Sequence, residues 1–253
     1  DAIRRIAGRP DEIETAVKAK GTWHSYVELH IEQGGTLDKA RIPIGIVEGI
    51  VAIHRYDVVI DGQVNHAGTT PMNERHDAMV AASQLTLAVR EIASRRQGRQ
   101  VGTVGRIEIE PNSPNVIPGK ATLSIEFRDL SERVLIEMGD AIKARAAAIA
   151  TETGTAITLT LASTNVPAMA ASGVQEAIGR AAAAANLQAI KLPSGAGHDA
   201  QQVASLAPMG MIFVPSVGGI SHSPRELTTW DDCARGADVL LKTVLELDQR
   251  DSV

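Results

Sequence analysis

The chain has 253 residues, of which 44% are hydrophobic and 22% charged, with a net charge of −5 and a pI near 5.8. This is the composition of a globular protein with a sizeable core, and the core must be aliphatic because aromatic residues make up only 2%. The dispersed Lys and Arg residues argue against nucleic-acid binding, and no run of about 18 apolar residues predicts a membrane span. The single cysteine, Cys233, excludes an internal disulfide and fits a reducing compartment, so we expect a cytoplasmic protein.

The first part of the chain predicts a short helix over residues 11–20 and a strand over Tyr26–Gly34. In this strand, apolar residues alternate with Glu28, His30 and Glu32. Because successive side chains of a strand point to opposite faces, one face should carry a histidine and two carboxylates.

The middle of the chain predicts a small domain over residues 49–166. A Pro/Gly-punctuated stretch over residues 42–49 indicates a crossing between domains. The expected elements are a strand (50–61), a helix (77–94), two strands (101–110 and 120–129), a helix (131–152) and a strand (155–163). This β-α-β-β-α-β order is that of a ferredoxin-like domain.

The last part of the chain, residues 167–253, predicts an α/β layer. The expected elements are a helix (172–185), a strand (188–192), a Gly-rich loop with His198 that leads into a helix, a strand (209–215), a loop with His222 and a final helix (229–247). Strands that end in Gly-rich loops are typical of an α/β domain with its site at the strand ends. We expect residues 1–48 and 167–253 to form one α/β domain that is interrupted by the ferredoxin-like domain.

Four histidines, namely His30, His66, His198 and His222, lie beside glycine, acidic or hydroxyl residues. Histidines and carboxylates together are typical ligands of zinc. Because the chain has no short ligand motif such as H-E-x-x-H, the pattern leaves ligation by each histidine open. His66 lies in the turn sequence Asn65–Met72, which fits a catalytic histidine and a structural turn histidine equally well.

Arg128 lies on the polar face of its predicted strand, and we expect it beside the turn that contains Asn115. Such a pair can bind a carboxylate, because a guanidinium group binds it through two hydrogen bonds. The alternative is that Arg128 pairs with Glu126 or Asp129 on a solvated face. Nucleophilic catalysis is not indicated, because the chain has no G-x-S-x-G motif.

Six motifs together resemble the hydantoinase/carbamoylase group of zinc amidohydrolases, which includes N-carbamoyl-L-amino-acid hydrolases, allantoate amidohydrolases and β-ureidopropionases. These enzymes are relatives of the aminoacylase and carboxypeptidase G type metallopeptidases. The resemblance covers nearly the whole chain. The motifs are Glu28–Gly34 (ELHIEQG), Asn65–Met72 (NHAGTTPM) with Arg75 and Asp77, Pro114–Gly119 (PNVIPG), Glu126–Asp129 (EFRD), Gly195–Asp199 (GAGHD) and Ser221–Glu226 (SHSPRE).

The resemblance implies a catalytic domain with two divalent metal ions, zinc first and manganese or cobalt as alternatives, and a ferredoxin-like lid that also forms a homodimer. It implies hydrolysis of the amide bond of N-carbamoyl-L-amino acids or related ureido acids such as allantoate. The implied zinc ligands are His30 and His222, one on each metal. The other implied site residues are Gln33 at the ureido group, His66 at the scissile carbonyl of the partner subunit's site, Asn115 and Arg128 at the substrate carboxylate, and Gly197 in the pocket lining.

One departure limits this expectation. The group's His-x-Asp segment, bridging aspartate and Glu-Glu pair precede the ELHIEQG strand, and residues 1–25 contain no match to them. The chain therefore resembles the C-terminal half to two-thirds of such an enzyme, and by itself we expect it to be inactive. The alternatives are a catalytically incomplete dimerisation and substrate-binding fragment and, more remotely, an aminoacylase or dipeptidase.

Overall fold

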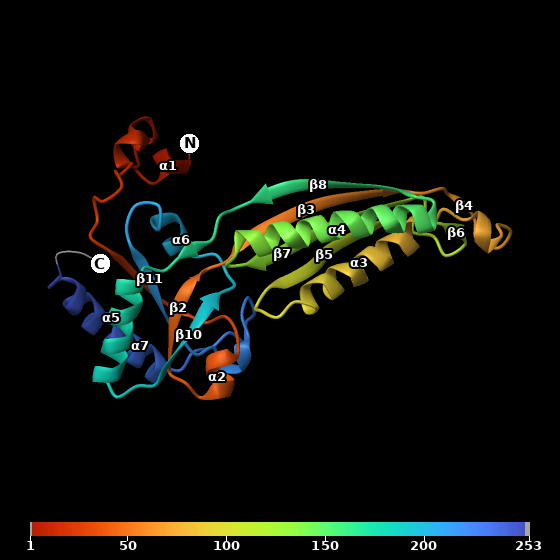
Figure 1. The fold of residues 1–253 in the computed structure, drawn as a ribbon. Helices are drawn as coiled ribbons and strands as arrows, with labels where there is room; N and C mark the ends of the chain where they lie inside the picture. The colour runs from red at the N-terminus through yellow and green to blue at the C-terminus, as the bar shows by residue number, and fades with distance from the viewer. Residues whose placement is uncertain (1, 251–253) are drawn as a thin grey trace. The chain divides into compact units, whose positions relative to one another are not determined.

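The computed structural model describes residues 2–250, which belong to two compact units (Figure 1). Unit 1 combines the residues up to Ile50 with those from Met169 onward, and unit 2 consists of Val51–Ala168. Among the described residues, no helix is long and apolar enough to cross a membrane. The chain thus leaves unit 1 once, forms unit 2 and returns.

Unit 2 has the ferredoxin-like architecture that the sequence predicts. Its four strands are antiparallel and lie in the order β5-β7-β3-β8. The elements are β3 (Ala52–Asp61), α3 (Ala78–Ser94), β5 (Val101–Glu110), β7 (Lys120–Asp129), α4 (Glu132–Thr153) and β8 (Ala156–Thr164). Every predicted element is confirmed within two residues, because the periods of strand and helix are distinct in this part of the chain.

Both helices of unit 2 lie on the same side of its sheet (Figure 1). Their apolar stripes meet the inward-facing side chains of β3 and β7 in one aliphatic core, with Tyr56 and Phe127 as its aromatic members. Asp77 accepts hydrogen bonds from the first backbone N–H groups of α3, and Ser131 does the same for α4. These caps fix where each helix begins, so the loops before them have defined positions.

A two-stranded hairpin lies beyond the main sheet of unit 2. It pairs β4 (Asn65–His66) with β6 (Val116–Ile117), and the 3₁₀ turn η2 (Met72–Glu74) follows β4. The hairpin lies at the end of the sheet where β3 finishes and β7 begins (Figure 1).

Unit 1 is built around a mixed sheet in the order β1-β11-β2-β10, with β9 paired to β2. β1 runs parallel to β11, β11 runs antiparallel to β2, and β2 runs parallel to β10. Helices α5 and α7 contribute apolar side chains to the core of this unit. The elements are α1 (Ala2–Arg5), η1 (Pro10–Ala16), β1 (Tyr26–Ile31), α2 (Thr36–Ala40), β2 (Ile44–Ile50), β9 (Ala168–Met169), α5 (Ser172–Ala184), β10 (Ala189–Ser194), α6 (Asp199–Val203), β11 (Met209–Val214), η3 (Val217–Gly219) and α7 (Trp230–Leu247).

Two predictions for unit 1 are wrong. Residues 42–49 are not a crossing between domains, because most of them form the buried strand β2. Gly45 is needed there for packing, since a Cβ would lie 2.7 Å from the Leu192 side chain. The predicted helix over 11–20 is only the short 3₁₀ segment η1, and none of its residues is buried. Without an apolar face to bury, a longer helix gains no packing energy.

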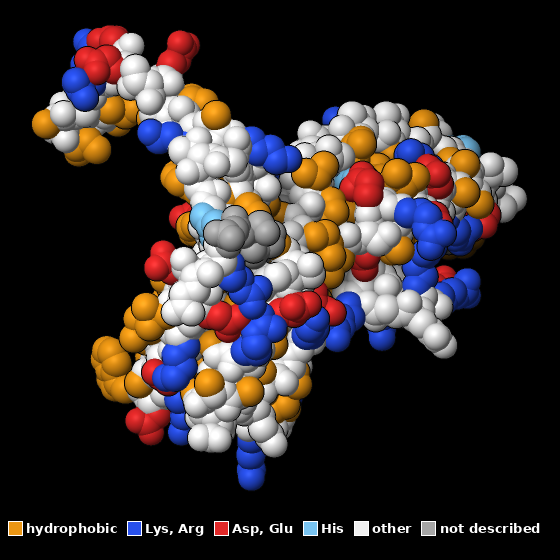
Figure 2. Space-filling view, turned by 60° about the vertical axis from the view of Figure 1, so that its left-hand side comes forward, with side chains coloured by type: hydrophobic (Ala, Val, Ile, Leu, Met, Phe, Trp, Pro, Cys, Tyr) orange, Lys and Arg blue, Asp and Glu red, His pale blue; other side chains and the backbone are white. Residues whose placement is uncertain are grey.

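Charged residues of both signs lie next to one another on the face of the molecule shown in Figure 2. Many of them form ion pairs, such as Arg180 with Glu246 and Arg235 with Asp232. Exposed pairs of this kind each contribute little to stability, so the fold depends mainly on its two aliphatic cores.

Candidate active site

Strand β1 places Glu28 and His30 on the same side of the sheet in unit 1. Its apolar residues Val27, Leu29 and Ile31 pack against the core of the unit, so the alternate side chains project to the other side. The second predicted carboxylate of this face, Glu32, is directed elsewhere. It accepts hydrogen bonds from the first N–H groups of α2, because β1 has already ended at Ile31.

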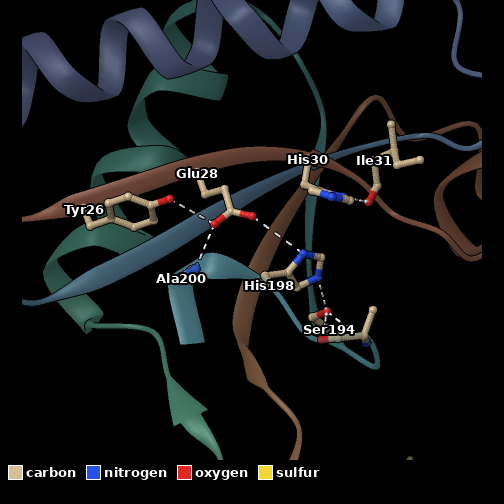
Figure 3. A network of polar contacts seen from close by, with 8 residues as sticks. Tyr26, Glu28, His30, Ile31, Ser194, His198 and Ala200 are labelled. Atoms are coloured by element: carbon tan, nitrogen blue, oxygen red, sulfur yellow. Dashed lines mark hydrogen bonds and ion pairs between the residues drawn. The ribbon is translucent and has the colours of Figure 1, made fainter. Parts of the chain in front are cut away.

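The loop between β10 and α6 brings His198 next to Glu28, and Ser194 at the end of β10 contacts the same histidine ring (Figure 3). His198 Nδ1 lies 3.6 Å from Glu28 Oε1, and His198 Nε2 lies 2.7 Å from Ser194 Oγ. The backbone N–H of Ala200 donates to Glu28 Oε2 at 2.9 Å, and the Tyr26 hydroxyl donates to the same oxygen at 3.2 Å. Residues from β1, β10 and α6 therefore form one polar network.

The rings of His30 and His198 pack edge to face, with their centroids 4.5 Å apart. Burial, and to a lesser extent the neighbouring His30, lowers the pKa of His198 to about 4, so this imidazole is neutral at pH 7. His30 Nδ1 lies 2.8 Å from the carbonyl oxygen of Ile31. A carbonyl only accepts, so His30 carries a proton on Nδ1, and in the neutral ring Nε2 keeps its lone pair for a ligand.

Glu28, His30 and His198 can each offer one ligand atom, and these atoms lie within 4.8 Å of one another. A neutral imidazole and a carboxylate are the donors that zinc and similar divalent ions prefer. The donor set therefore fits such an ion, and His30 fits best because its Nε2 has no hydrogen bond within residues 2–250.

His222 lies outside this group, on the exposed loop between η3 and α7, where its own backbone N–H donates to Glu226 Oε2 at 2.9 Å. Hydrogen bonds from Ser221 and from this N–H lower the pKa of Glu226, and the charges of His222 and His30 add to the effect. Gln33 Nε2 donates to Ser221 Oγ at 3.3 Å. The structure thus brings the three predicted residues His30, Gln33 and His222 to one region of unit 1, although His222 does not join the group of three ligands.

Gly197, the other predicted site residue of unit 1, lies in the loop that carries His198. A Cβ at this position would meet only Gln201 Oε1, at 3.8 Å. The fold itself therefore does not require glycine here, and the role of Gly197 in lining a pocket stays a prediction.

His66 lies at the tip of unit 2, in a loop that its own hydrogen bonds hold in place. The Gly68 N–H donates to His66 Nδ1 at 2.9 Å, so the proton of the neutral ring is on Nε2, which becomes a donor. The Arg75 guanidinium donates to the carbonyl oxygens of Ala67 and Thr70. An exposed histidine thus presents an N–H group from a loop of defined conformation.

Asn115 lies beside this loop, because its carbonyl oxygen accepts from the Ala67 N–H at 3.0 Å and β6 pairs with β4. Arg128 does not lie beside the Asn115 turn, so this prediction is wrong. The strand from Lys120 to Arg128 spans roughly 26 Å at about 3.3 Å per residue, and the turn lies at its Lys120 end. The sequence indicated that Arg128 lies on the polar face of β7, but it did not indicate how far along the strand Arg128 lies from the Asn115 turn.

Arg128 pairs with Glu126, as the alternative from the sequence proposed, with Nε 2.6 Å from Glu126 Oε1. Arg55 donates to the other oxygen of the same carboxylate. Burial raises the pKa of Glu126, but the hydrogen bonds from Arg55 and Arg128 outweigh it and lower the pKa overall. Arg128 thus has a fixed position on the face of the sheet opposite the helices.

Three residues of the polar network, Glu28, His198 and Ser194, were not predicted as site residues, although the sequence left metal ligation by His198 open. The alternation in β1 indicated Glu28, since it shares a face with His30. No sequence pattern indicated Ser194, because it lies within a strand. Its hydroxyl meets His198 only in the folded chain.

Residues 4–246 match the family model described as "Peptidase family M20/M25/M40". The chain is 41% identical over 249 residues to an N-carbamoyl-L-amino acid amidohydrolase of Geobacillus stearothermophilus, and this match covers 98% of the chain and 61% of the relative. It is 37% identical over 223 residues to an allantoate amidohydrolase of Escherichia coli K12, covering 88% of the chain and 54% of that protein.

Solved structures agree with these relatives. A hydantoinase/carbamoylase family amidase from Burkholderia multivorans has a TM-score of 0.87 and 36% identity, and the match covers 91% of this chain and 56% of that one. The structure described as AtUAH in complex with glyoxylate has a TM-score of 0.83 and 34% identity, with 96% of this chain and 58% of that one covered. The chain thus spans little more than half the length of these proteins, and it belongs to the peptidase family M20/M25/M40.

Proposed function

We propose that the full-length protein hydrolyses the amide bond of a ureido acid, such as an N-carbamoyl-L-amino acid or allantoate, with two divalent metal ions. The names of the relatives support this substrate class. The observation that carries the proposal is His30, whose Nε2 is available as a ligand beside Glu28 and His198. Zinc is the first choice of metal because imidazole and carboxylate suit it.

His30 and His222 would each bind one ion, with the remaining ligands in the part of the relatives that this chain does not span. Bound ions of this kind lower the pKa of water and polarise the scissile carbonyl group. Gln33, which already contacts the loop of His222 through Ser221, would bind the ureido group, and Gly197 would line the pocket. The single cysteine, Cys233, fits a cytoplasmic protein.

Unit 2 would serve as the lid. His66 would donate from Nε2 to the scissile carbonyl, and Asn115 and Arg128 would bind carboxylate groups of substrates. Because Arg128 and the Asn115 turn lie roughly 26 Å apart along β7, one small ureido acid cannot contact both. We therefore propose a homodimer. In it, the His66 loop of each subunit contributes to the active site of the partner subunit, and Arg128 of the same subunit contributes to a different active site.

A second candidate is that this chain, by itself, is a dimerisation and substrate-binding fragment. The described residues contain one group of three possible ligands, whereas two metal ions need two sets. An aminoacylase or dipeptidase activity on the same fold is a more remote alternative.

Metal analysis and substrate profiling test these candidates. For the full-length protein, we expect two zinc ions per chain and cleavage of N-carbamoyl in preference to N-acyl and peptidyl L-amino acids. Near-zero metal in the 253-residue chain, together with two ions in the full-length protein, would support the fragment as a description of this chain alone. Preferential cleavage of acyl or peptidyl substrates would contradict the ureido assignment.

A further inference from the structure

Glu28, His198 and Ser194 form a polar network that is largely buried. The side chain of His198 is 1% exposed, and Ser194 is buried to the same degree. Burying polar groups costs free energy unless each one is hydrogen-bonded. Here each has a partner, so the network is complete without any added ligand.

Both nitrogens of the His198 ring face partners within the chain. Nδ1 lies 3.6 Å from Glu28 Oε1, an ion-pair distance, and Nε2 shares a hydrogen bond of 2.7 Å with Ser194 Oγ. The Ser194 hydroxyl is itself held by the backbone of Ala196, since its Oγ lies 3.1 Å from the Ala196 carbonyl oxygen, to which it can donate. Both nitrogens of this ring therefore have partners, in contrast to His30, whose Nε2 has no hydrogen bond to the residues that the structure describes.

Two other interpretations of the network are less consistent with these contacts. Ser194, His198 and Glu28 have the order of a nucleophile, base and acid, but a serine that is 1% exposed cannot reach a substrate. Its Oγ also accepts from the Ala196 N–H at 3.2 Å. His198 as a metal ligand would have to give up its hydrogen bond to Ser194 or its contact with Glu28.

The network instead packs against one side of the His30 ring. The His198 ring packs against the His30 ring at 4.5 Å, and both rings contact Phe213. On the other side, the Ile31 carbonyl holds His30 Nδ1. Figure 3 shows His30 beside His198, with Glu28 and Ser194 each joined to a different nitrogen of the His198 ring. A fixed His198 therefore leaves His30 with one orientation.

We propose that His198, held by Glu28 and Ser194, is a positioning residue that fixes the orientation of the His30 imidazole for metal binding. This inference rests on the proposed function, in which His30 is a metal ligand. It assigns roles to Glu28, Ser194 and His198 as residues that support a ligand without contacting the metal. Outer-sphere partners of this kind typically change metal affinity 10- to 100-fold.

The test uses the full-length protein with Ser194→Ala, and with Ser205→Ala as the matched control. Ser205 lies just after α6 and bonds only to the Gln202 carbonyl in the described structure. We expect Ser194→Ala to weaken zinc binding about 10-fold in a chelator competition titration, with the number of bound ions unchanged, and Ser205→Ala to bind as the unmodified protein does. Ser194→Ala removes one oxygen atom, so it remains informative even where His198→Gln does not fold.

Nitrogen NMR of the histidine rings supplies a readout that does not need metal. In the metal-free protein we expect His30 to carry its proton on Nδ1, and in Ser194→Ala we expect a mixture of His30 tautomers. Unchanged zinc affinity and an unchanged His30 tautomer in Ser194→Ala would overturn the proposal. So would the loss of one whole zinc equivalent in folded His198→Gln, because that result would make His198 a ligand.

The outcomes separate this inference from the proposed function. If the full-length protein binds zinc and cleaves ureido acids while Ser194→Ala behaves as the control does, only the positioning role fails. If the unmodified protein neither binds zinc nor cleaves ureido acids, the proposed function fails. The NMR comparison in the metal-free protein then decides whether the network orients His30.

Discussion

The network around His198 in unit 1 and the His66 loop of unit 2 present their polar groups in opposite ways. In unit 1, Glu28 and His198 are largely withdrawn from solvent and bonded to one another or to backbone groups. In unit 2, His66 and Asn115 are exposed on loops, and their hydrogen bonds fix the backbone while leaving His66 Nε2 as a donor.

This difference indicates two kinds of task. A metal ligand must hold one orientation for a long time, which favours a buried and fully bonded surrounding. A group that contacts a passing substrate must be reachable, and loops on a rigid scaffold provide that access. The His198 network therefore suits the holding of a metal ligand, and the His66 loop suits contact with a substrate.

The largest expected effect is that of His66→Ala in the full-length protein. Loss of one hydrogen-bond donor to a developing oxyanion typically lowers turnover by about 10²- to 10³-fold. We expect kcat on an N-carbamoyl-L-amino acid to fall by this amount with little change in zinc content. His24→Ala, which changes an exposed histidine of unit 1, is the control. A fall in zinc content with His66→Ala would contradict the assignment of His66 to substrate contact and not to metal binding.

Arg128→Ala should act mainly on binding. A charge-assisted hydrogen bond contributes about 1.5 to 3 kcal/mol, so KM should rise roughly 10- to 100-fold with a smaller change in kcat. Steady-state kinetics measure this split, with Arg106→Ala on the neighbouring strand as the control. Negligible effects of both His66→Ala and Arg128→Ala would refute the role of unit 2 in contacting substrate.

Acid should destabilise unit 1 through His198. The pKa of His198 in the folded chain is about 4, below the ordinary value of 6.5, so between these pH values the unfolded chain binds a proton that the folded chain does not. His198 therefore leaves the unfolding free energy unchanged above pH 6.5 and lowers it progressively as the pH falls from 6.5 towards 4. From pH 7.5 to 5 the loss should be on the order of 2 kcal/mol.

Urea unfolding of the metal-free protein at these two pH values measures the loss. His198→Gln should show a smaller dependence on pH than the unmodified protein, and His24→Gln should not differ from it. The same pH dependence in all three proteins would contradict the neutral, buried state of His198.

The smallest expected effect comes from the N-cap of α3. Asp77 accepts from two backbone N–H groups, and replacing such a cap by alanine costs about 1 kcal/mol. Asp77→Ala should lower the unfolding free energy by this amount and leave zinc affinity unchanged. Asp140→Ala, at an exposed position within α4, is the control. Weaker zinc binding in Asp77→Ala would contradict the expectation that the stability of unit 2 does not affect metal binding in unit 1.

The sequence predicted the fold of unit 2 better than that of unit 1. The helices α3 and α4 have clear apolar stripes with Asp77 and Ser131 as caps, and these are local signals. Strand β2 was missed because its glycine and the preceding proline suggested a loop. Gly45 is there because Leu192 and Phe213 from other strands pack against it, and no local pattern reports such a contact.

For the candidate site, the sequence by itself determined which residues could carry the chemistry. The alternation of β1 placed Glu28 and His30 on one face, and the turn residues around His66 indicated a loop. The tertiary structure alone decided that His198 lies against Glu28 and His30 with Ser194 at its other nitrogen, and that Arg128 lies far from Asn115. The physical reason is that side-chain periodicity is a local property of the backbone, whereas strand order and position along a strand depend on pairing between distant segments.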